Sequence, residues 1–250
     1  EWVCKLTQRD VWRLVDTTVR SGGVMTGNRL MEAIAAHIGD APIETLPVRF
    51  GAVATDLYTG EEIWLREGPF MTAVRASSGL PGLFSPTWHE GRWLIDGGVV
   101  NPVPVSLCRA LGADVVIAVD LRRSVTQVAM RALEHSGRNE AAPEQEASTE
   151  GTAILQKWAG LVDGLVETFR SRRSEPGLFE VMTSAVNIMQ DRITRSRLAI
   201  DPADLVLRPD LTRFQLMDFH RGREAIDVGH ALVDQVAAQL EPISAQLNPP

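Results

Sequence analysis

The chain has 250 residues, of which 44% are hydrophobic, and it carries a formal net charge of -7. A chain of this length can bury a large core, in one large domain or two small ones. Its acidic balance argues against a surface that neutralises phosphates, so we expect no nucleic-acid partner. The two cysteines, Cys4 and Cys108, fit neither a disulfide framework nor a zinc spacing, and we expect buried thiols in a reducing compartment.

Neither a membrane span nor a secretory leader is visible in the sequence. No run reaches the roughly 18 apolar residues that a membrane-spanning helix needs, and the start lacks the basic-then-apolar profile of a signal peptide. We therefore expect a cytoplasmic protein that can contact the inner face of the membrane peripherally. Because the chain begins with Glu1 and not with methionine, we also expect it to be processed or truncated.

The first half of the chain alternates helical and strand patterns. Short apolar runs rich in β-branched residues predict strands, and apolar residues three or four apart predict helices. In chain order these patterns predict a helix over 29–38, a strand buried on both faces over 48–55, a return strand over 62–66, a helix over 70–76, a strand over 92–95, a helix over 104–111 and a buried strand over 115–119. The last three would form a βαβ unit with parallel strands, which predicts an open α/β sheet.

The composition changes after Arg123. Residues 136–152 contain many Glu and Ala but no large hydrophobic side chain and no apolar periodicity, which is typical of a flexible segment. Beyond it, the apolar spacing predicts helices over 154–169, 178–193 and 221–240, with a short strand over 204–208.

The position of Asp96 in the sequence makes it a candidate catalytic carboxylate. Asp96 follows the predicted strand over 92–95, and Gly97 and Gly98 allow a sharp turn after it. In open α/β sheets, ligand sites form just beyond the carboxyl ends of parallel strands. A carboxylate held there is partly desolvated, which raises its pKa toward the range in which it accepts a proton from a hydroxyl. Asp96 is therefore a candidate general base, and the competing interpretation is a turn whose aspartate caps its own backbone.

Three strand-end positions raise the question of a metal site. Asp56, Asp96 and Asp120 each end a predicted strand and could together hold Mg²⁺ for phosphoryl transfer, although no phosphate-binding glycine loop accompanies them. The five histidines have no metal-ligand spacing, so we expect surface or helix-end positions for them and no metal site.

Two features could touch lipid. Trp64, Trp88 and Trp93 lie near Asp96 in the sequence, and they either reach a bilayer interface or pack against the sheet edge. The predicted helix over 154–169 is followed by three arginines within 170–173. It either lies on anionic lipid or packs in the core with basic residues at its carboxyl end.

The residues around Asp96 resemble a known family. The segment ASSGLPGLFSP, followed within ten residues by LIDGGVVNPVPVSLCRALGADVVIAVDL, resembles the distal half of bacterial patatin-like phospholipases, the small single-domain esterases of that family. The resemblance extends backward through LPVRFGAVATDLYTGEEIWLREG and forward to NIMQDRITRSRLAIDPADLVLRPDL and MDFHRGREAIDVG. It covers roughly 180 residues and leaves out the acidic segment.

The resemblance implies a serine-aspartate dyad that hydrolyses acyl esters of lipids without a histidine and without a cofactor. Asp96 matches the aspartate of the family's D-G-G motif, which Gly97 and Gly98 complete. The family's glycine-rich oxyanion loop and its G-x-S-x-G elbow have no match in the 250 residues, and Ser77 and Ser78 lack the flanking glycines of an elbow. We therefore expect a chain that carries the base but no nucleophile and that is inactive alone.

The expected fold is a three-layer α/β/α sandwich, amino-terminally incomplete, with a helical carboxyl-terminal extension. We expect the distal part of a patatin-like phospholipase domain over 1–122, a flexible acidic insert over 123–153, and over 154–250 a helical extension with one short strand packing on the sheet. The expected partner is a lipid or acyl ester substrate. The alternative is a non-catalytic patatin-like pseudoenzyme that acts as a binding or regulatory module, and it differs in lacking a G-x-S-x-G in frame before Glu1.

Deletion of residues 136–152 should leave the melting temperature nearly unchanged, because a solvated segment contributes little to the folded state and shortening it alters loop closure only slightly. Thermal unfolding followed by circular dichroism tests this. A fall of many degrees would mean that the segment is structured.

Overall fold

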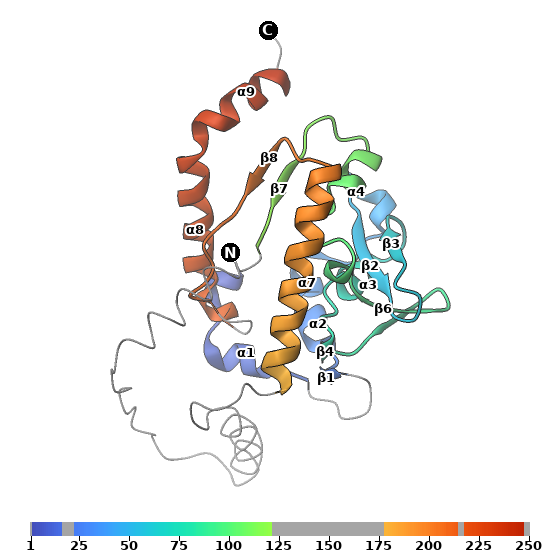
Figure 1. The fold of residues 1–250 in the computed structure, drawn as a ribbon. Coiled ribbons are helices and arrows are strands. Elements are labelled where there is room, and N and C mark those ends of the chain that lie inside the picture. The colour runs from blue at the N-terminus through green and yellow to red at the C-terminus, as the bar shows by residue number, and fades with distance from the viewer. Residues whose placement is uncertain (1, 17–22, 122–177, 215–217, 248–250) are drawn as a thin grey trace.

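The computed structural model describes residues 2–16, 23–121, 178–214 and 218–247, and it shows a mixed α/β fold with three small sheets (Figure 1). The α-helices are α1 (Gln8–Leu14), α2 (Asn28–Ile38), α3 (Phe70–Ser77), α4 (Val105–Ala110), α7 (Leu178–Ile200), α8 (Gly222–Gln235) and α9 (Ala237–Leu247). The strands are β1 (Gly23–Met25), β2 (Ala52–Asp56), β3 (Glu62–Leu65), β4 (Gly82–Phe84), β5 (Thr87–His89), β6 (Arg92–Asp96), β7 (Ile117–Val119) and β8 (Leu205–Leu207).

The largest sheet has the order β3-β2-β6-β5, and every neighbouring pair in it is antiparallel. All five residues of β2 are buried, which confirms a fully buried strand, but it begins at Ala52, and residues 48–51 are neither strand nor buried. The chain returns into β3 through a turn in which Gly60 has a positive φ of 71° and the Asp56 carboxylate accepts the backbone N–H groups of Tyr58 and Thr59.

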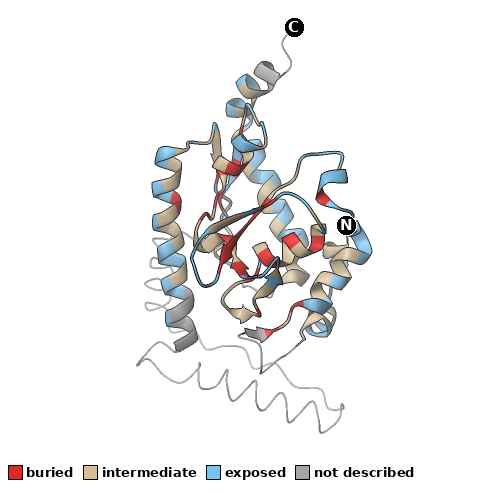
Figure 2. Cartoon of the chain, turned by 90° about the vertical axis from the view of Figure 1, so that its right-hand side faces the viewer, coloured by how far each residue is buried: buried red, intermediate tan, exposed pale blue. Residues whose placement is uncertain are grey.

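Helix α3 covers one face of this sheet, and Figure 2 shows the buried residues gathered at that contact. Small side chains allow the helix to approach closely, since Ala54 on β2 and Ala76 on α3 are both completely buried. Around them the cluster adds Ile43, Ala52, Leu65, Ala73 and Leu94, and the tilted rings of Phe50 and Phe70 are in contact at its edge.

The predicted βαβ unit is wrong, because its two strands, β6 and β7, do not pair with each other. Both edges of β6 are occupied, by β2 and β5, so β7 cannot join it. Instead β7 pairs in parallel with β8, which comes from the far end of the chain. The face of β7 that carries Val116 and Ala118 packs on Val103 and Val105 near α4 and on Leu198 of α7.

Several predicted boundaries changed. Helix α7 runs to Ile200, beyond the predicted end at 193, and the predicted helix over 221–240 is two helices that meet at Val236. Helix α1 and strands β1, β4 and β5 were not predicted, because segments of three to seven residues show too little periodicity. The predicted helix over 154–169 and the segment 136–152 lie outside the described residues.

The cysteines differ from expectation, since Cys4 and Cys108 are both free but only partly buried. Cys108 packs against the apolar cluster around β7. Among the histidines that the structure describes, His37 and His230 are exposed, whereas the Nδ1 atom of His220 is buried. Within the described ranges, no helix is both long enough and apolar enough to cross a membrane.

Thr194→Val should leave the free energy of unfolding unchanged or raise it by up to about 1 kcal/mol. Thr194 on α7 is 1% exposed, and its buried hydroxyl has no hydrogen-bond partner among the described residues, so the substitution removes a polar group at nearly constant shape. Urea unfolding measures the change.

The matched control is Thr55→Val. Thr55 is 2% exposed, but its hydroxyl donates to the Asp96 carbonyl at 2.8 Å, so the same substitution there should cost about 1 to 2 kcal/mol. Equal losses at the two positions would show that the Thr194 hydroxyl is bonded.

Candidate functional site

The backbone of Asp96 is held from two sides. Its N–H donates to the carbonyl of Gly79, just after α3, at 3.0 Å, and its carbonyl accepts the Thr55 hydroxyl of β2 at 2.8 Å. In the sheet, Asp96 lies opposite Ala54. The expectation that Asp96 lies at the end of a strand in a parallel sheet is therefore wrong, because both neighbours of its strand β6 are antiparallel to it. A buried hydroxyl and a loop carbonyl, rather than a parallel sheet edge, fix where this residue lies.

The two oxygens of the Asp96 carboxylate have different surroundings. Oδ1 accepts the Gly98 N–H at 2.6 Å and caps the short 3-10 turn Gly97–Val99, as the capping interpretation expected. No donor among the described residues bonds to Oδ2. Burial raises the pKa of Asp96, and the Gly98 N–H offsets part of that rise. The result is a half-buried carboxylate with increased basicity and one oxygen left for a ligand hydroxyl.

Close packing against backbone requires a glycine at position 97, whereas at position 98 the nearest atoms belong to side chains. A Cβ on Gly97 would lie 2.0 Å from the Val53 carbonyl oxygen of β2, far inside any real contact. A Cβ on Gly98 would lie 2.9 Å from Asp96 Oδ1 and 2.7 Å from Nε2 of Gln190 on α7. The D-G-G turn therefore lies against β2 on one side and α7 on the other.

Glu62 of β3 joins the turn to α7. Its Oε1 accepts Asn101 Nδ2 at 2.8 Å and Trp64 Nε1 at 2.7 Å, and its Oε2 pairs with Arg197 Nη2 at 2.7 Å. Burial alone would raise the pKa of Glu62, but the hydrogen bonds of Asn101 and Trp64 and the charge of Arg197 outweigh it and lower the pKa. Glu62 is thus an ionised anchor between the sheet, the loop after the D-G-G turn, and α7.

Arg75 on α3 was missed by the sequence reasoning. Its guanidinium donates to the carbonyls of Thr26 and Ser85 and lies over the Phe84 ring, with Cζ 5.2 Å from the ring centroid. It therefore ties α3, which leads to Gly79, to the loops around β1 and β4. The sequence did contain one signal for this role, since Arg75 is a single arginine within the apolar pattern of the predicted helix over 70–76.

The serines near the site have other roles. Ser77 is the last residue of α3, and the Ser78 hydroxyl donates to the Val74 carbonyl at 2.8 Å, which closes the helix. The Ser85 hydroxyl is buried and donates to the Met25 carbonyl at 3.3 Å, so it joins β4 to β1. None of these hydroxyls is hydrogen-bonded to the Asp96 carboxylate.

The three aspartates that could have formed a metal site do not meet. Asp56 lies opposite Leu94, because β2 and β6 run in opposite directions, and its carboxylate contacts Arg92 at 3.4 Å. Asp120 follows β7 in a different sheet and pairs with Arg208 at 3.4 Å. Across the described ranges, no group of three or more His, Cys, Asp or Glu side chains is arranged to hold a metal ion.

The three tryptophans share one face of the four-stranded sheet. Trp64 faces Val53 in the register, and Trp88 pairs with Trp93 across β5 and β6 with ring centroids 5.0 Å apart. All three remain exposed, by 37% for Trp64, 56% for Trp88 and 38% for Trp93. Each tryptophan packs against sheet neighbours on one side and meets solvent on the other. The geometry therefore does not decide between contact with a bilayer interface and packing against the sheet edge.

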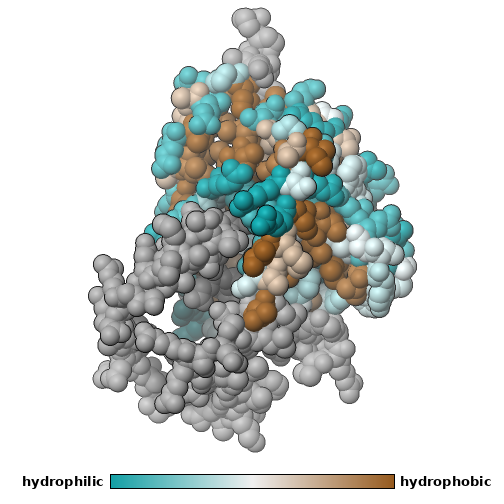
Figure 3. Space-filling view, viewed as in Figure 1, coloured by the Kyte–Doolittle hydropathy of each residue, from teal (hydrophilic) through white to brown (hydrophobic). Residues whose placement is uncertain are grey.

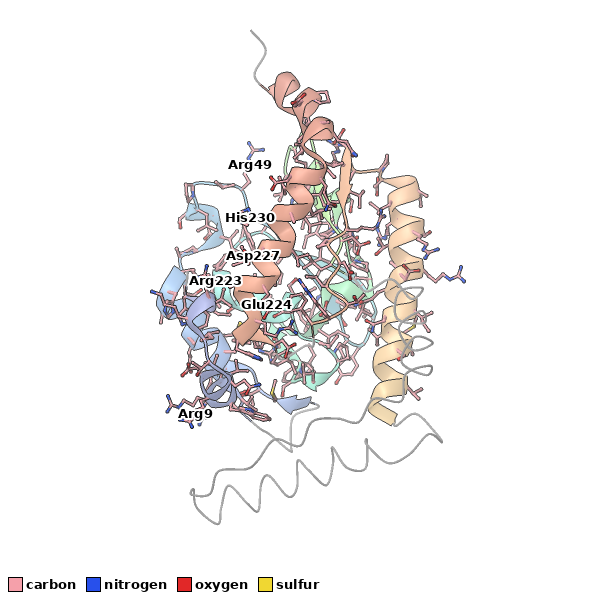
Figure 4. The ribbon with its side chains drawn as sticks, turned by 90° about the vertical axis from the view of Figure 1, so that its left-hand side faces the viewer. Arg9, Arg49, Arg223, Glu224, Asp227 and His230 are labelled. Atoms are coloured by element: carbon pink, nitrogen blue, oxygen red, sulfur yellow. The ribbon has the colours of Figure 1, made fainter. Side chains whose placement is uncertain are left out.

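An apolar groove of about 310 Å³ lies away from Asp96, between the β7–β8 pair and α8. Val119, Leu207, Ile226 and Val233 line it, and Figure 3 shows hydrophobic side chains gathered there between α8 and α7. His230 also lines it, and Figure 4 shows that residue on α8 together with the exposed Arg223, Glu224 and Asp227. Apart from His230, the residues that line the groove are apolar, and the groove contains no carboxylate comparable with that of Asp96.

Comparison with known proteins identifies the family. The family model of patatin-like phospholipases matches residues 3–109. An uncharacterized NTE family protein of Mycobacterium tuberculosis is 31% identical over 280 residues, which cover 96% of this chain and 77% of the relative. A second NTE family protein, from Mycobacterium bovis, is 37% identical over 92% of this chain and 35% of the relative. The chain belongs to the NTE family of proteins with a patatin-like phospholipase domain.

A relative with a named activity is more distant. A lysophospholipase of Emericella nidulans is 26% identical over 223 residues, which cover 88% of this chain but only 13% of that protein. The match to the family model ends at Arg109, so helix α7 and strand β8 lie outside it.

Gly97→Ala should lower the free energy of unfolding by about 3 kcal/mol, because the new methyl group meets the Val53 carbonyl and β2 or the turn must move. Gly229→Ala is the matched control: a Cβ there meets no atom within 4 Å inside α8, so it should raise stability by about 0.5 to 1 kcal/mol. Chemical unfolding of both variants measures the difference. A mild loss at Gly97 would mean that the turn is not held against β2.

Proposed function

We propose that this chain is part of a serine acyl ester hydrolase that acts on lipids, with Asp96 as the general base. The observation that carries the proposal is the Asp96 carboxylate itself. It is half-buried, its pKa is raised by burial, and its Oδ2 has no donor among the described residues. Membership of the NTE family and the similarity to a lysophospholipase support a lipid ester as the substrate class.

In the proposed reaction, Asp96 Oδ2 accepts the proton of a serine hydroxyl as the serine oxygen attacks the acyl carbonyl carbon. The tetrahedral intermediate then collapses, and the leaving alcohol takes the proton from Asp96. Water attacks the resulting acyl-enzyme, again with Asp96 as the base, and releases the fatty acid. The raised basicity of a desolvated carboxylate favours the proton transfer, and no histidine is needed.

The nucleophile of this reaction is not in a G-x-S-x-G motif among the 250 residues. The proposal therefore requires that the serine and the oxyanion-binding backbone come from sequence outside them. This same observation favours a second candidate function, a non-catalytic patatin-like module that binds or regulates. The reading frame upstream of the Glu1 codon separates the two, since a G-x-S-x-G there supports the hydrolase.

Asp96→Asn in the complete product of the gene should reduce lysophospholipid hydrolysis by about 100-fold or more, because the amide cannot accept the serine proton while its shape is nearly the same. Release of free fatty acid from lysophosphatidylcholine measures the activity, and thermal unfolding checks that the variant is folded. Asp114→Asn, an exposed aspartate in the turn before β7, is the control and should retain full activity.

The outcomes separate the candidates. Retained hydrolysis in Asp96→Asn would remove Asp96 from the mechanism. Loss of hydrolysis in EDTA would favour a metal-dependent reaction. An unmodified protein that neither hydrolyses the ester nor reacts with a fluorophosphonate probe would favour the non-catalytic module.

A further inference from the structure

Helix α7 reaches the D-G-G turn although it lies outside the residues that the family model matches. The Nε2 atom of Gln190 and the Oδ1 atom of Asp96 lie 2.7 Å and 2.9 Å from the same point, the position of a Cβ on Gly98. The carboxamide of Gln190 therefore packs on Gly98, the residue whose N–H binds the carboxylate of the candidate base. Figure 1 shows α7 on the face turned to the viewer, and Figure 4 shows it along one side of the molecule.

The position of Gln190 is fixed by the rest of the helix. Gln190, Thr194 and Arg197 are spaced by four and three residues, so they share one face of α7. Thr194 is buried on that face, and Arg197 is bound by Glu62 and by the Val100 carbonyl, immediately after the D-G-G turn. Asn187 lies one turn before Gln190 on the same side of α7, and it is exposed. The helix is thus anchored two turns away from Gln190, with the Gln190 side directed at the turn.

We propose that Gln190 is a positioning residue of the acyl hydrolysis site, whose neutral carboxamide packs on Gly98 and holds the Asp96 carboxylate in the geometry and environment that proton transfer needs. The inference rests on the proposed function, since it assigns a role relative to Asp96 as the base. It makes α7 part of the site, and it explains why an uncharged polar side chain occupies this place on a helix that carries several charges.

An electrostatic consequence follows, because the side chains of Gln190 and Asp96 both lie against Gly98. Replacing the neutral amide with a carboxylate puts a like charge beside Asp96, which disfavours ionisation of Asp96. The substitution leaves the other charged groups on the packed elements with their present partners. Glu62 pairs with Arg197, Asp191 pairs with Arg195, and Arg92 of β6 pairs with Asp56 and Glu61. Arg75 of α3 donates to backbone carbonyls. A change in the titration of Asp96 can then be assigned to position 190.

The test compares Gln190→Glu with Asn187→Asp in the complete product of the gene. Both add one negative charge to α7 by replacing an amide with a carboxylate, but only the first lies beside Asp96. The acid limb of the pH profile of kcat/KM should move to higher pH in Gln190→Glu, which corresponds to about a tenfold loss on that limb. Asn187→Asp should match the unmodified protein. Identical profiles for the two variants would overturn the proposal.

A readout without catalysis keeps the inference separate from the proposed function. In the 250-residue chain, the Asp96 carboxyl carbon can be titrated by ¹³C NMR, with Asp96→Asn to assign the signal. A shift of its midpoint to higher pH in Gln190→Glu, with none in Asn187→Asp, supports the proposed neighbourhood even if the complete protein proves inactive. An unshifted midpoint overturns it even if the complete protein hydrolyses lipids.

Gln190→Met covers the case in which the charged variant fails to fold. It keeps most of the side-chain volume but removes the amide, so the Asp96 carboxylate loses a polar neighbour. Its Asp96 midpoint should also move to higher pH, and kcat should fall with little change in KM. A Gln190→Met protein with an unchanged midpoint and unchanged kcat would show that the side chain only fills space.

Discussion

The close approach of the D-G-G turn to strand β2 is the constraint on which the site depends. Gly97 lies so near the Val53 carbonyl that no side chain fits between them, and this contact sets where β6 ends and where its last residue points. The Thr55 hydroxyl, two residues along β2, then holds the Asp96 carbonyl from the same strand. One buried strand therefore fixes both the turn and the backbone of the candidate base. Because packed interiors transmit small displacements, a shift of β2 would move the carboxylate with it.

Burial of Asp96 has two opposed effects. It raises the basicity of the carboxylate, which favours proton transfer from a hydroxyl, but it also disfavours the ionised form that must accept the proton. The single N–H donor of Gly98 stabilises the ionised form in part, and it does so through the oxygen that faces its own turn. The other oxygen keeps the increased basicity. Gly98 thus contributes a backbone hydrogen bond to the carboxylate, whereas Gly97 allows the close approach to β2.

Local sequence patterns predicted the elements that are long or strongly patterned, but not how distant ones meet. The buried strand β2, its return strand and helix α3 were predicted because each has a clear apolar pattern and a turn next to it. The D-G-G turn was found from its glycines and its resemblance to a family. Pairing of β7 with β8 and the contact of α7 with Gly98 depend on residues far apart in the chain, and no local pattern carries that information. Arg75 and Gln190 were missed for this reason.

The Glu62 anchor explains how a helix so far along the chain can be held accurately at the turn. Glu62 receives donors from its own strand, from the loop after the D-G-G turn and from α7, so one carboxylate fixes three segments relative to one another. A partly buried ion pair that is also hydrogen-bonded on both oxygens compensates for its desolvation, whereas an isolated carboxylate there would not. Since Arg197 binds Glu62 and Val100 together, any movement of α7 away from the turn would break both contacts. Accurate placement of Gln190 therefore depends on Glu62 and Arg197, not on the length of the sequence between β7 and α7.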